Sequence, residues 1–198
     1  MQLAKRMDVI RGSVIRDVAT EIADRDNPNL IKLSGGLPDE QYFPMEDLKT
    51  AAEKIFADPA LYGESLQYGL TKGDTELIDL IIERLNRNEG FGITTDNIII
   101  CTGCQQGISM ACTALLNDGE TILIEKPSYL DGLNAALPYN PNIVGVETDD
   151  YGIMPSKLDE ALKAHPDTKI VYVIPNFQNP TGKAWPLERR KEFLEVIA

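Results

Sequence analysis

Four short runs of apolar residues in the second half of the chain constrain its fold more than any other feature. They occupy residues 98–101, 121–124, 143–146 and 170–174, and they are rich in isoleucine and valine. Apolar residues on successive positions suit strands that are buried on both faces, and helix-like segments separate the runs. This alternation predicts an α/β fold with a mostly parallel sheet, flanked by helices and joined by right-handed crossovers.

Amphipathic helices are predicted elsewhere in the chain. Three segments of the first half carry apolar residues at helical spacing: residues 13–24, 46–56 and 75–85. Ser13 is a candidate N-cap of the first helix, and Asp74 or Thr75 of the third. A last helix is predicted over residues 187–198, and neither a glycine nor a polar cap follows it. We therefore expect that the chain ends within a domain, so that its fold is truncated.

Charge and hydropathy exclude several classes of protein. Lys and Arg number 19 against 31 Asp and Glu, and the net charge of -12 repels a nucleic-acid backbone. The longest basic cluster, residues 189–191, is flanked by two glutamates, which is typical of a solvated helix face. The start of the sequence has no apolar leader, and no apolar run is long enough to span a bilayer. We expect a cytoplasmic protein that binds neither nucleic acid nor membrane.

The cysteines and the single histidine argue against metal, redox and hydrolase sites. Cys101, Cys104 and Cys112 lie within one short segment, and an odd number of cysteines does not suit a disulfide scaffold. The C-x-x-C spacing of the first two lacks the second pair that a zinc site needs, and His165 lies far away in the sequence. No G-x-S-x-G elbow accompanies that histidine. We expect no bound metal and no Ser-His-Asp triad.

Three loops with specialised residues each follow a predicted strand, where open α/β sheets bind their ligands. Gly103 lies in the first loop, directly before a predicted helix. The N–H groups at a helix start bind anions, and a glycine there lets a phosphate approach the backbone. The alternative is a plain turn before the helix.

The other two loops carry an aromatic ring and a side-chain amide. Tyr129 follows the run at residues 121–124, and it can either stack on a planar cofactor ring or belong to the core. Asn179 precedes a proline, which favours an extended backbone, and Gly182 can supply a positive φ. A rigidly held amide is a well-directed hydrogen-bond donor. The alternative is an asparagine that only caps its own turn.

Taken together, four motifs resemble those of the fold-type I pyridoxal-phosphate enzymes, most closely the class I/II aminotransferases of the aromatic, kynurenine and 2-aminoadipate kind. They are N-P-T-G at residues 179–182, G-C-Q-Q at residues 103–106, S-G-G-L-P with a later F-P within residues 34–44, and Y-G-x-x-x-G at residues 68–73. The motifs stand in the family's order over nearly the whole chain. The resemblance implies the aspartate aminotransferase fold, the cofactor pyridoxal 5'-phosphate, and transfer of an amino group between an amino acid and a 2-oxo acid.

The resemblance also implies roles for individual residues at the cofactor. The backbone of Gly103, Cys104 and Gln105 would hold the phosphate, with Cys104 at a position where the family usually has Ser or Ala. Tyr129 would stack on the pyridine ring. Asn179 would donate a hydrogen bond to the cofactor's phenolic oxygen and would also line the substrate site.

Further implications concern the substrate side and the motifs that this chain does not contain. Tyr68 would reach the phosphate site of the neighbouring subunit in a homodimer, and Gly36 would line the substrate pocket. The Schiff-base lysine is expected beyond Ala198, so we expect no catalytic residue in this chain and no activity from it alone. The chain would then comprise an N-terminal arm with the substrate loop, residues 1–45, and the incomplete first part of the large cofactor domain, residues 46–198.

The sequence leaves two other functions open. One is the aminotransferase-like effector domain of a GntR/MocR-type transcription regulator, which would need an N-terminal DNA-binding extension. The other is a lyase or an enzyme similar to aminocyclopropane-carboxylate synthase. Reaction type on this scaffold depends on groups that stand outside the sequence at hand.

Overall fold

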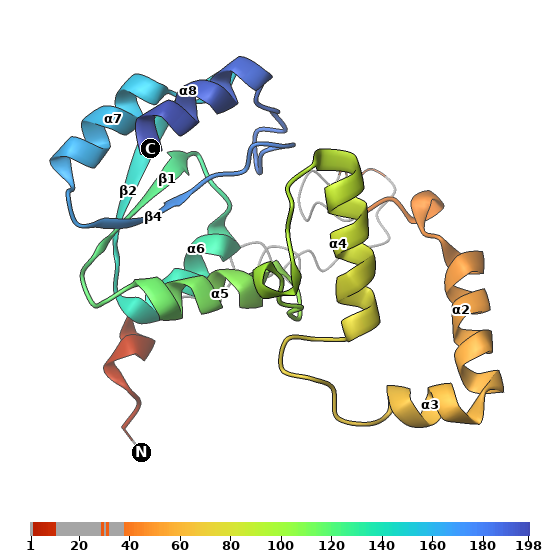
Figure 1. Ribbon diagram of the computed structural model, residues 1–198. Helices are drawn as coiled ribbons and strands as arrows, with labels where there is room; N and C mark the ends of the chain where they lie inside the picture. Colours follow the sequence, from red (N-terminus) through yellow and green to blue (C-terminus); the bar gives the residue numbers. More distant parts are fainter. Residues whose placement is uncertain (1, 11–28, 30, 32–37) are drawn as a thin grey trace. The chain divides into compact units, whose positions relative to one another are not determined.

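A computed structural model describes residues 2–10, 29, 31 and 38–198 (Figure 1). The chain forms two compact units. The first combines Met1–Asp17 with Thr102–Ala198, and the second is Val18–Cys101. The helix predicted over residues 13–24 lies outside the described residues.

A four-stranded sheet is the centre of the first unit. Its strands are β1 (Thr121–Lys126), β2 (Asn142–Asp149), β3 (Gly152–Ile153) and β4 (Thr168–Tyr172). The strand order is β3-β2-β1-β4, with β1 parallel to both of its neighbours and β3 antiparallel to β2. The predicted α/β class and mostly parallel sheet are therefore confirmed, and three of the four predicted strands are present.

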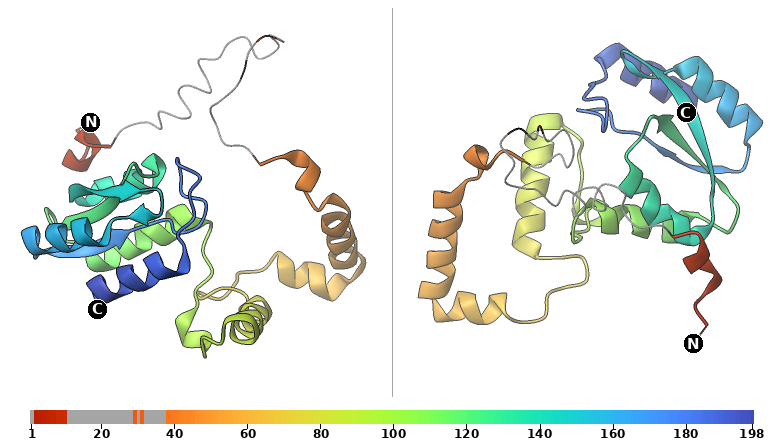
Figure 2. Two further views of the ribbon diagram at one scale, coloured as in Figure 1. Left: turned by 90° about the horizontal axis from the view of Figure 1, so that it is seen from above. Right: turned by 180° about the vertical axis from the view of Figure 1, so that it is seen from behind.

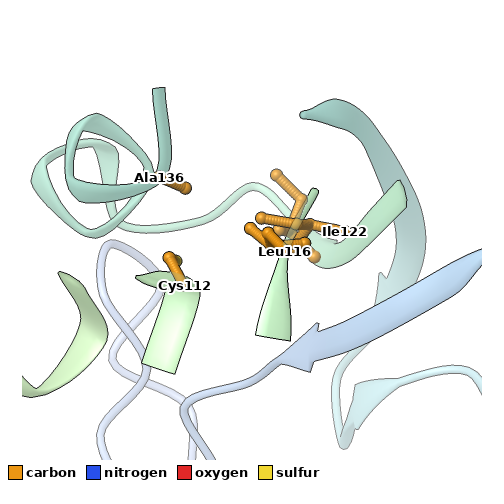
Figure 3. Packing of buried hydrophobic residues seen from close by; sticks show 5 residues of the cluster. Cys112, Leu116, Ile122 and Ala136 are labelled. Atoms are coloured by element: carbon orange, nitrogen blue, oxygen red, sulfur yellow. The ribbon is translucent and has the colours of Figure 1, made fainter. Parts of the chain in front are cut away.

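Helices cover both faces of this sheet (Figures 1 and 2). They are α5 (Cys104–Leu115) and α6 (Leu130–Ala136) on one face, and α7 (Pro155–Ala164) and α8 (Leu187–Ile197) on the other. Ile122 packs towards Cys112 of α5 (Figure 3), and Ile124 belongs to the same buried cluster, whereas Leu123 packs against Leu158 of α7. Because side chains alternate along a strand, a run of successive apolar residues supplies two cores at once. Each fully buried aliphatic side chain stabilises the fold by about 1.5–3 kcal/mol.

The second unit is helical where it is described. It contains α2 (Met45–Ala57), α3 (Pro59–Ser65) and α4 (Thr75–Glu89). The predicted cap of α4 is Asp74, whose carboxylate accepts a hydrogen bond of 2.8 Å from the Leu77 N–H. Ile78 is the one buried residue of α4, and α2 and α3 contain none. The apolar stripe that predicted α2 therefore faces solvent within the described residues.

Short 3-10 helices complete the described chain: η1 (Lys5–Asp8), η2 (Glu40–Tyr42), η3 (Thr95–Asn97) and η4 (Leu137–Tyr139). None of the helices in the described residues is both long and apolar enough to cross a membrane.

The strand predicted over residues 98–101 is absent. This segment follows η3 as extended chain, and its backbone contact runs to a loop: the Ile100 N–H donates to the Lys72 carbonyl at 2.8 Å. Gly73, at φ 111°, allows that approach, because a Cβ there would lie 2.5 Å from the Ile100 side chain. An apolar, β-branched run becomes a strand only where a neighbouring strand completes its ladder, and no described strand pairs with it.

Candidate functional site

The start of α5 forms the first part of the site. Gly103 is its N-cap, with φ 88° and ψ 168°, and among the described residues no atom beyond its chain neighbours lies within 4 Å of the place where a Cβ would be. A positive φ and an open approach are both properties that favour glycine. The N–H groups of the first helical turn have no carbonyl partner within the helix. With the helix dipole, they make this end suitable for an anion such as phosphate.

Two tyrosine side chains, one from the start of α6 and one from β4, lie near the start of α5. Tyr129 is the N-cap residue of α6, and its hydroxyl lies 3.5 Å from the Gln105 amide nitrogen. Tyr172, at the end of β4, approaches the same place. A Cβ at Gly132 would lie 3.0 Å from the Tyr172 hydroxyl and 3.1 Å from the Tyr129 ring, so a larger residue there would crowd both rings where they approach α6.

Tyr172 was not among the residues singled out from the sequence. Burial raises the pKa of its hydroxyl, and the neighbouring Cys104 and Tyr129 add smaller effects in the same direction. The hydroxyl therefore stays protonated through neutral pH and remains a hydrogen-bond donor. Its sequence signal is a tyrosine in the middle of the apolar run at residues 170–174, whereas Tyr129 was identified in the loop that follows a run.

The loop after β4 contains Asn179, which is exposed to solvent. Its side chain makes no hydrogen bond within the part of the chain that the structure describes. The neighbouring Gln178, in contrast, is only 4% exposed. The Gln178 amide donates to the Pro127 carbonyl at 2.9 Å, which links the Asn179 loop to the loop that contains Tyr129.

Glu125 lies beneath these two loops as a fully buried carboxylate at the end of β1. One oxygen accepts the Ile174 N–H at 2.9 Å, and the other accepts the indole N–H of Trp185 at 3.2 Å. Burial raises the pKa of Glu125, and these two donors oppose the shift. β4 ends at Tyr172, and two residues later the Ile174 N–H bonds to this side chain. Glu125 therefore holds the chain that leads into the Asn179 loop.

Five of the seven predicted site residues belong to the first unit. Gln105 and Tyr129 are in contact, next to Gly103 and Cys104 at the start of α5. Asn179 belongs to the same unit, and its loop is joined to the Tyr129 loop through Gln178. Tyr68 belongs to the second unit, in the loop between α3 and α4, with 99% of its surface exposed. Gly36 lies outside the described residues.

The fold and its strand-end loops define the class first: an α/β protein with the aspartate aminotransferase fold. Among solved structures, an archaeal alanine:glyoxylate aminotransferase matches 98% of this chain with a TM-score of 0.85 and 29% identity, over 49% of its own chain. The kynurenine aminotransferase of Pyrococcus horikoshii, solved in complex with PMP, matches 98% of this chain with a TM-score of 0.84 and 33% identity, over 48% of its own chain.

The family follows from sequence comparison. A family model described as aminotransferase class I and II matches residues 28–198, and the chain belongs to this family. Aromatic-amino-acid aminotransferase 1 of Thermococcus litoralis is 34% identical over 96% of this chain and 45% of its own length. The 2-aminoadipate transaminase of Thermus thermophilus is 32% identical over 95% of this chain and 44% of its own length. The chain thus spans about half the length of the curated relatives it matches.

Proposed function

We propose that the protein is a pyridoxal-phosphate-dependent aminotransferase, which moves an amino group between an amino acid and a 2-oxo acid. The observation that carries the proposal is the start of α5. There a glycine with positive φ opens the helix next to the contact between Gln105 and Tyr129, in a member of the class I and II family.

The residues present fit this cofactor. The open space over Gly103 and the N–H groups of the first turn of α5 suit its phosphate, whose charge the helix dipole stabilises. Cys104 lacks the hydroxyl that a serine would offer to the phosphate, but the backbone donors of this turn remain. The half-buried Tyr129 offers an aromatic face for the pyridine ring.

The exposed amide of Asn179 is the proposed donor to the phenolic oxygen of the cofactor. Its lack of a side-chain partner among the described residues leaves the amide available for a ligand. When bound, the cofactor supplies the electron sink that allows proton removal at the substrate Cα. The contribution of this chain is to bind and orient the cofactor. The lysine that moves the proton is proposed to stand beyond Ala198, so that residues 1–198 by themselves would not turn over substrate.

The proposal includes a homodimer, in which Tyr68 reaches the phosphate site of the neighbouring subunit. The complete exposure of its side chain supports this role, as do exposed apolar side chains of α2 such as Leu48 and Phe56.

The proposal also includes a cytoplasmic location and the division of the chain into an arm, residues 1–45, and a cofactor domain, residues 46–198. Gly36 is proposed to line the substrate pocket.

The test uses the full-length protein with added pyridoxal phosphate. Aromatic amino acids, kynurenine and 2-aminoadipate are offered as amino donors, each with and without a 2-oxo acid acceptor, and both products are quantified. Equal amounts of new 2-oxo acid and new amino acid would support the proposal. Product formed without an acceptor would indicate a lyase, and cofactor binding without turnover would fit the regulator domain. Failure to bind the cofactor would refute the proposal.

A further inference from the structure

Gln178 holds two loops of the candidate site together, and neither the motifs nor the family role of Asn179 assigns it a function. It stands between β4 and the N-P-T-G motif, with its side chain 4% exposed. We propose that Gln178 is a positioning residue, which fixes Asn179 relative to Tyr129 through its buried carboxamide. This inference rests on the proposed function, because the roles of Asn179 and Tyr129 come from there.

Both ends of the carboxamide are used. The amide nitrogen donates to the Pro127 carbonyl at 2.9 Å, two residues before Tyr129. The amide oxygen accepts from the Thr181 N–H at 2.9 Å and from the Thr181 hydroxyl at 2.7 Å, two residues after Asn179. One side chain therefore spans from the Tyr129 loop to the far side of Asn179.

The backbone of Gln178 closes the loop as well. Its N–H donates to the Lys183 carbonyl at 2.7 Å, and its carbonyl accepts from the Gly182 N–H at 2.5 Å. Residues 179–182 are thus enclosed between contacts that all involve Gln178. Since Asn179 has no side-chain hydrogen bond among the described residues, its place is set by these contacts of its neighbour.

The residue before Gln178 indicates that the loop needs such support. Phe177 has φ 50°, a conformation that costs a bulky L-residue free energy. Its side chain is 82% exposed, so its own packing does not compensate. The contacts of Gln178 hold this turn on one side, and Arg190, which donates to the Asn176 side-chain oxygen at 2.6 Å, holds it on the other.

A carboxamide meets these demands because one of its ends donates and the other accepts. An ionised carboxylate at this position could accept from Thr181 but could not donate to the Pro127 carbonyl. It would also place a second negative charge near the buried Glu125, whose ionised form burial already disfavours. A methionine has nearly the same shape but neither donates nor accepts strongly.

The experiment compares Gln178→Glu and Gln178→Met with Asn179→Ala in the full-length protein. The control is Gln2→Glu, which makes the same charge change at an exposed position. With pyridoxal phosphate bound, the pKa of the cofactor absorption band is titrated. Loss of the Asn179 hydrogen bond should raise this pKa, by on the order of one unit, in both Gln178 variants and in Asn179→Ala. Gln2→Glu should leave it unchanged.

A double variant separates positioning from general destabilisation. If Gln178 acts through Asn179, then Gln178→Met combined with Asn179→Ala should show the same pKa as Asn179→Ala alone. Additive shifts, or no shift in the Gln178 variants, would overturn the inference. If the Gln178 variants do not fold, Thr181→Val, which removes one hydrogen bond to the same carboxamide, replaces them with a smaller expected shift in the same direction.

A measurement without the cofactor distinguishes this inference from the proposed function. Amide hydrogen exchange of the segment at residues 178–183 in the cofactor-free protein should be about tenfold faster in Gln178→Met than in the wild type. Unchanged exchange there would overturn the positioning role whether or not the protein binds pyridoxal phosphate. Faster exchange in a protein that binds no cofactor would instead refute the proposed function and keep Gln178 as the residue that orders the loop.

Discussion

Replacement of Glu125 by glutamine should destabilise the protein even though it removes a buried charge. In the wild type, one carboxylate oxygen accepts the partly buried Ile174 N–H, and the other accepts the buried indole N–H of Trp185. The glutamine oxygen can accept only one of the two, and its NH2 group then faces the other donor. A buried N–H without an acceptor costs about 1–3 kcal/mol.

Removing the buried charge offsets part of this cost, so we expect the free energy of unfolding to fall by about 1–2 kcal/mol in Glu125→Gln. Glu125→Leu leaves both N–H groups without an acceptor and should lose about 2–5 kcal/mol. The expected order of stability is therefore wild type, then Gln, then Leu. For a chain of this size, the midpoint of thermal unfolding should fall by about 2–4 °C for each kcal/mol.

The raised pKa of Glu125 fixes the direction in which pH changes the free energy of unfolding. Burial raises the pKa of Glu125 above its ordinary value of 4.5, so the folded protein binds a proton more tightly than the unfolded chain. This contribution to stability is fully present below pH 4.5 and is lost as the pH rises through the raised pKa. Glu125→Gln lacks this titration. The stability difference between wild type and Glu125→Gln should therefore be largest in acid and should narrow towards neutral pH.

The fluorescence of Trp185 can follow unfolding at the site of the substitution. It is the sole tryptophan of the 198 residues, it is 3% exposed, and its indole bonds to Glu125. Denaturant unfolding followed by its emission therefore reports on the contact that is changed. A Leu variant as stable as the wild type would show that the two N–H groups do not depend on the carboxylate. A stability difference that widens with rising pH would contradict the direction of the pKa shift.

Two further substitutions test the same unit. Gly152 has φ 106°, and an alanine there would place its Cβ 2.1 Å from the Trp185 indole nitrogen, so the ring must move. We expect Gly152→Ala to lower the free energy of unfolding by about 3 kcal/mol or more and to shift the Trp185 emission to the red. Gly90→Ala, at φ 69° with open space, is its control and should lose only about 1 kcal/mol, and equal losses would refute the steric argument. Asp149→Asn breaks a two-bond contact of 2.9 and 2.8 Å to Arg189 and should lower the unfolding midpoint slightly, whereas the exposed Asp150→Asn should not. Because the Arg189 contact lowers the pKa of Asp149, its stabilising effect should be present above pH 3.8 and should disappear as the pH falls through the lowered pKa, and an effect that grows in acid would contradict this.

The sequence predicted those helices and strands that form without a particular distant residue as partner. β1, β2 and β4 were predicted because apolar runs are buried between two helical layers whichever helices supply them. α4 was predicted with its Asp74 cap because capping depends on residues close in the chain. The segment at residues 98–101 has the same composition, but a strand also needs a neighbour, and the identity of that neighbour is a tertiary property.

The candidate site was predictable only in part for the same reason. Tyr129 and Asn179 follow the ends of β1 and β4, and that local rule placed them in loops of one unit. Gly103 follows the extended segment at residues 98–101 instead of a strand, and it belongs to the same unit as the N-cap of α5. Gln178 acts through Pro127, which is 51 residues away in the sequence, and a single glutamine in a loop gives no local signal of such a contact. Glu125 did offer a signal, because a lone carboxylate that ends an apolar run is either at the surface or buried with dedicated donors.

The buried residues explain how a site made of exposed groups can be well ordered. Asn179 and Cys104 face solvent, and their own side chains do little to fix them. The residues that hold the Asn179 loop, Glu125 and Gln178, lie in the interior beneath it. Their contacts form within one unit and need no ligand. A substitution at either residue should therefore change the behaviour of a bound cofactor without touching it, and that effect should be visible in the empty protein as faster exchange of the loop amides.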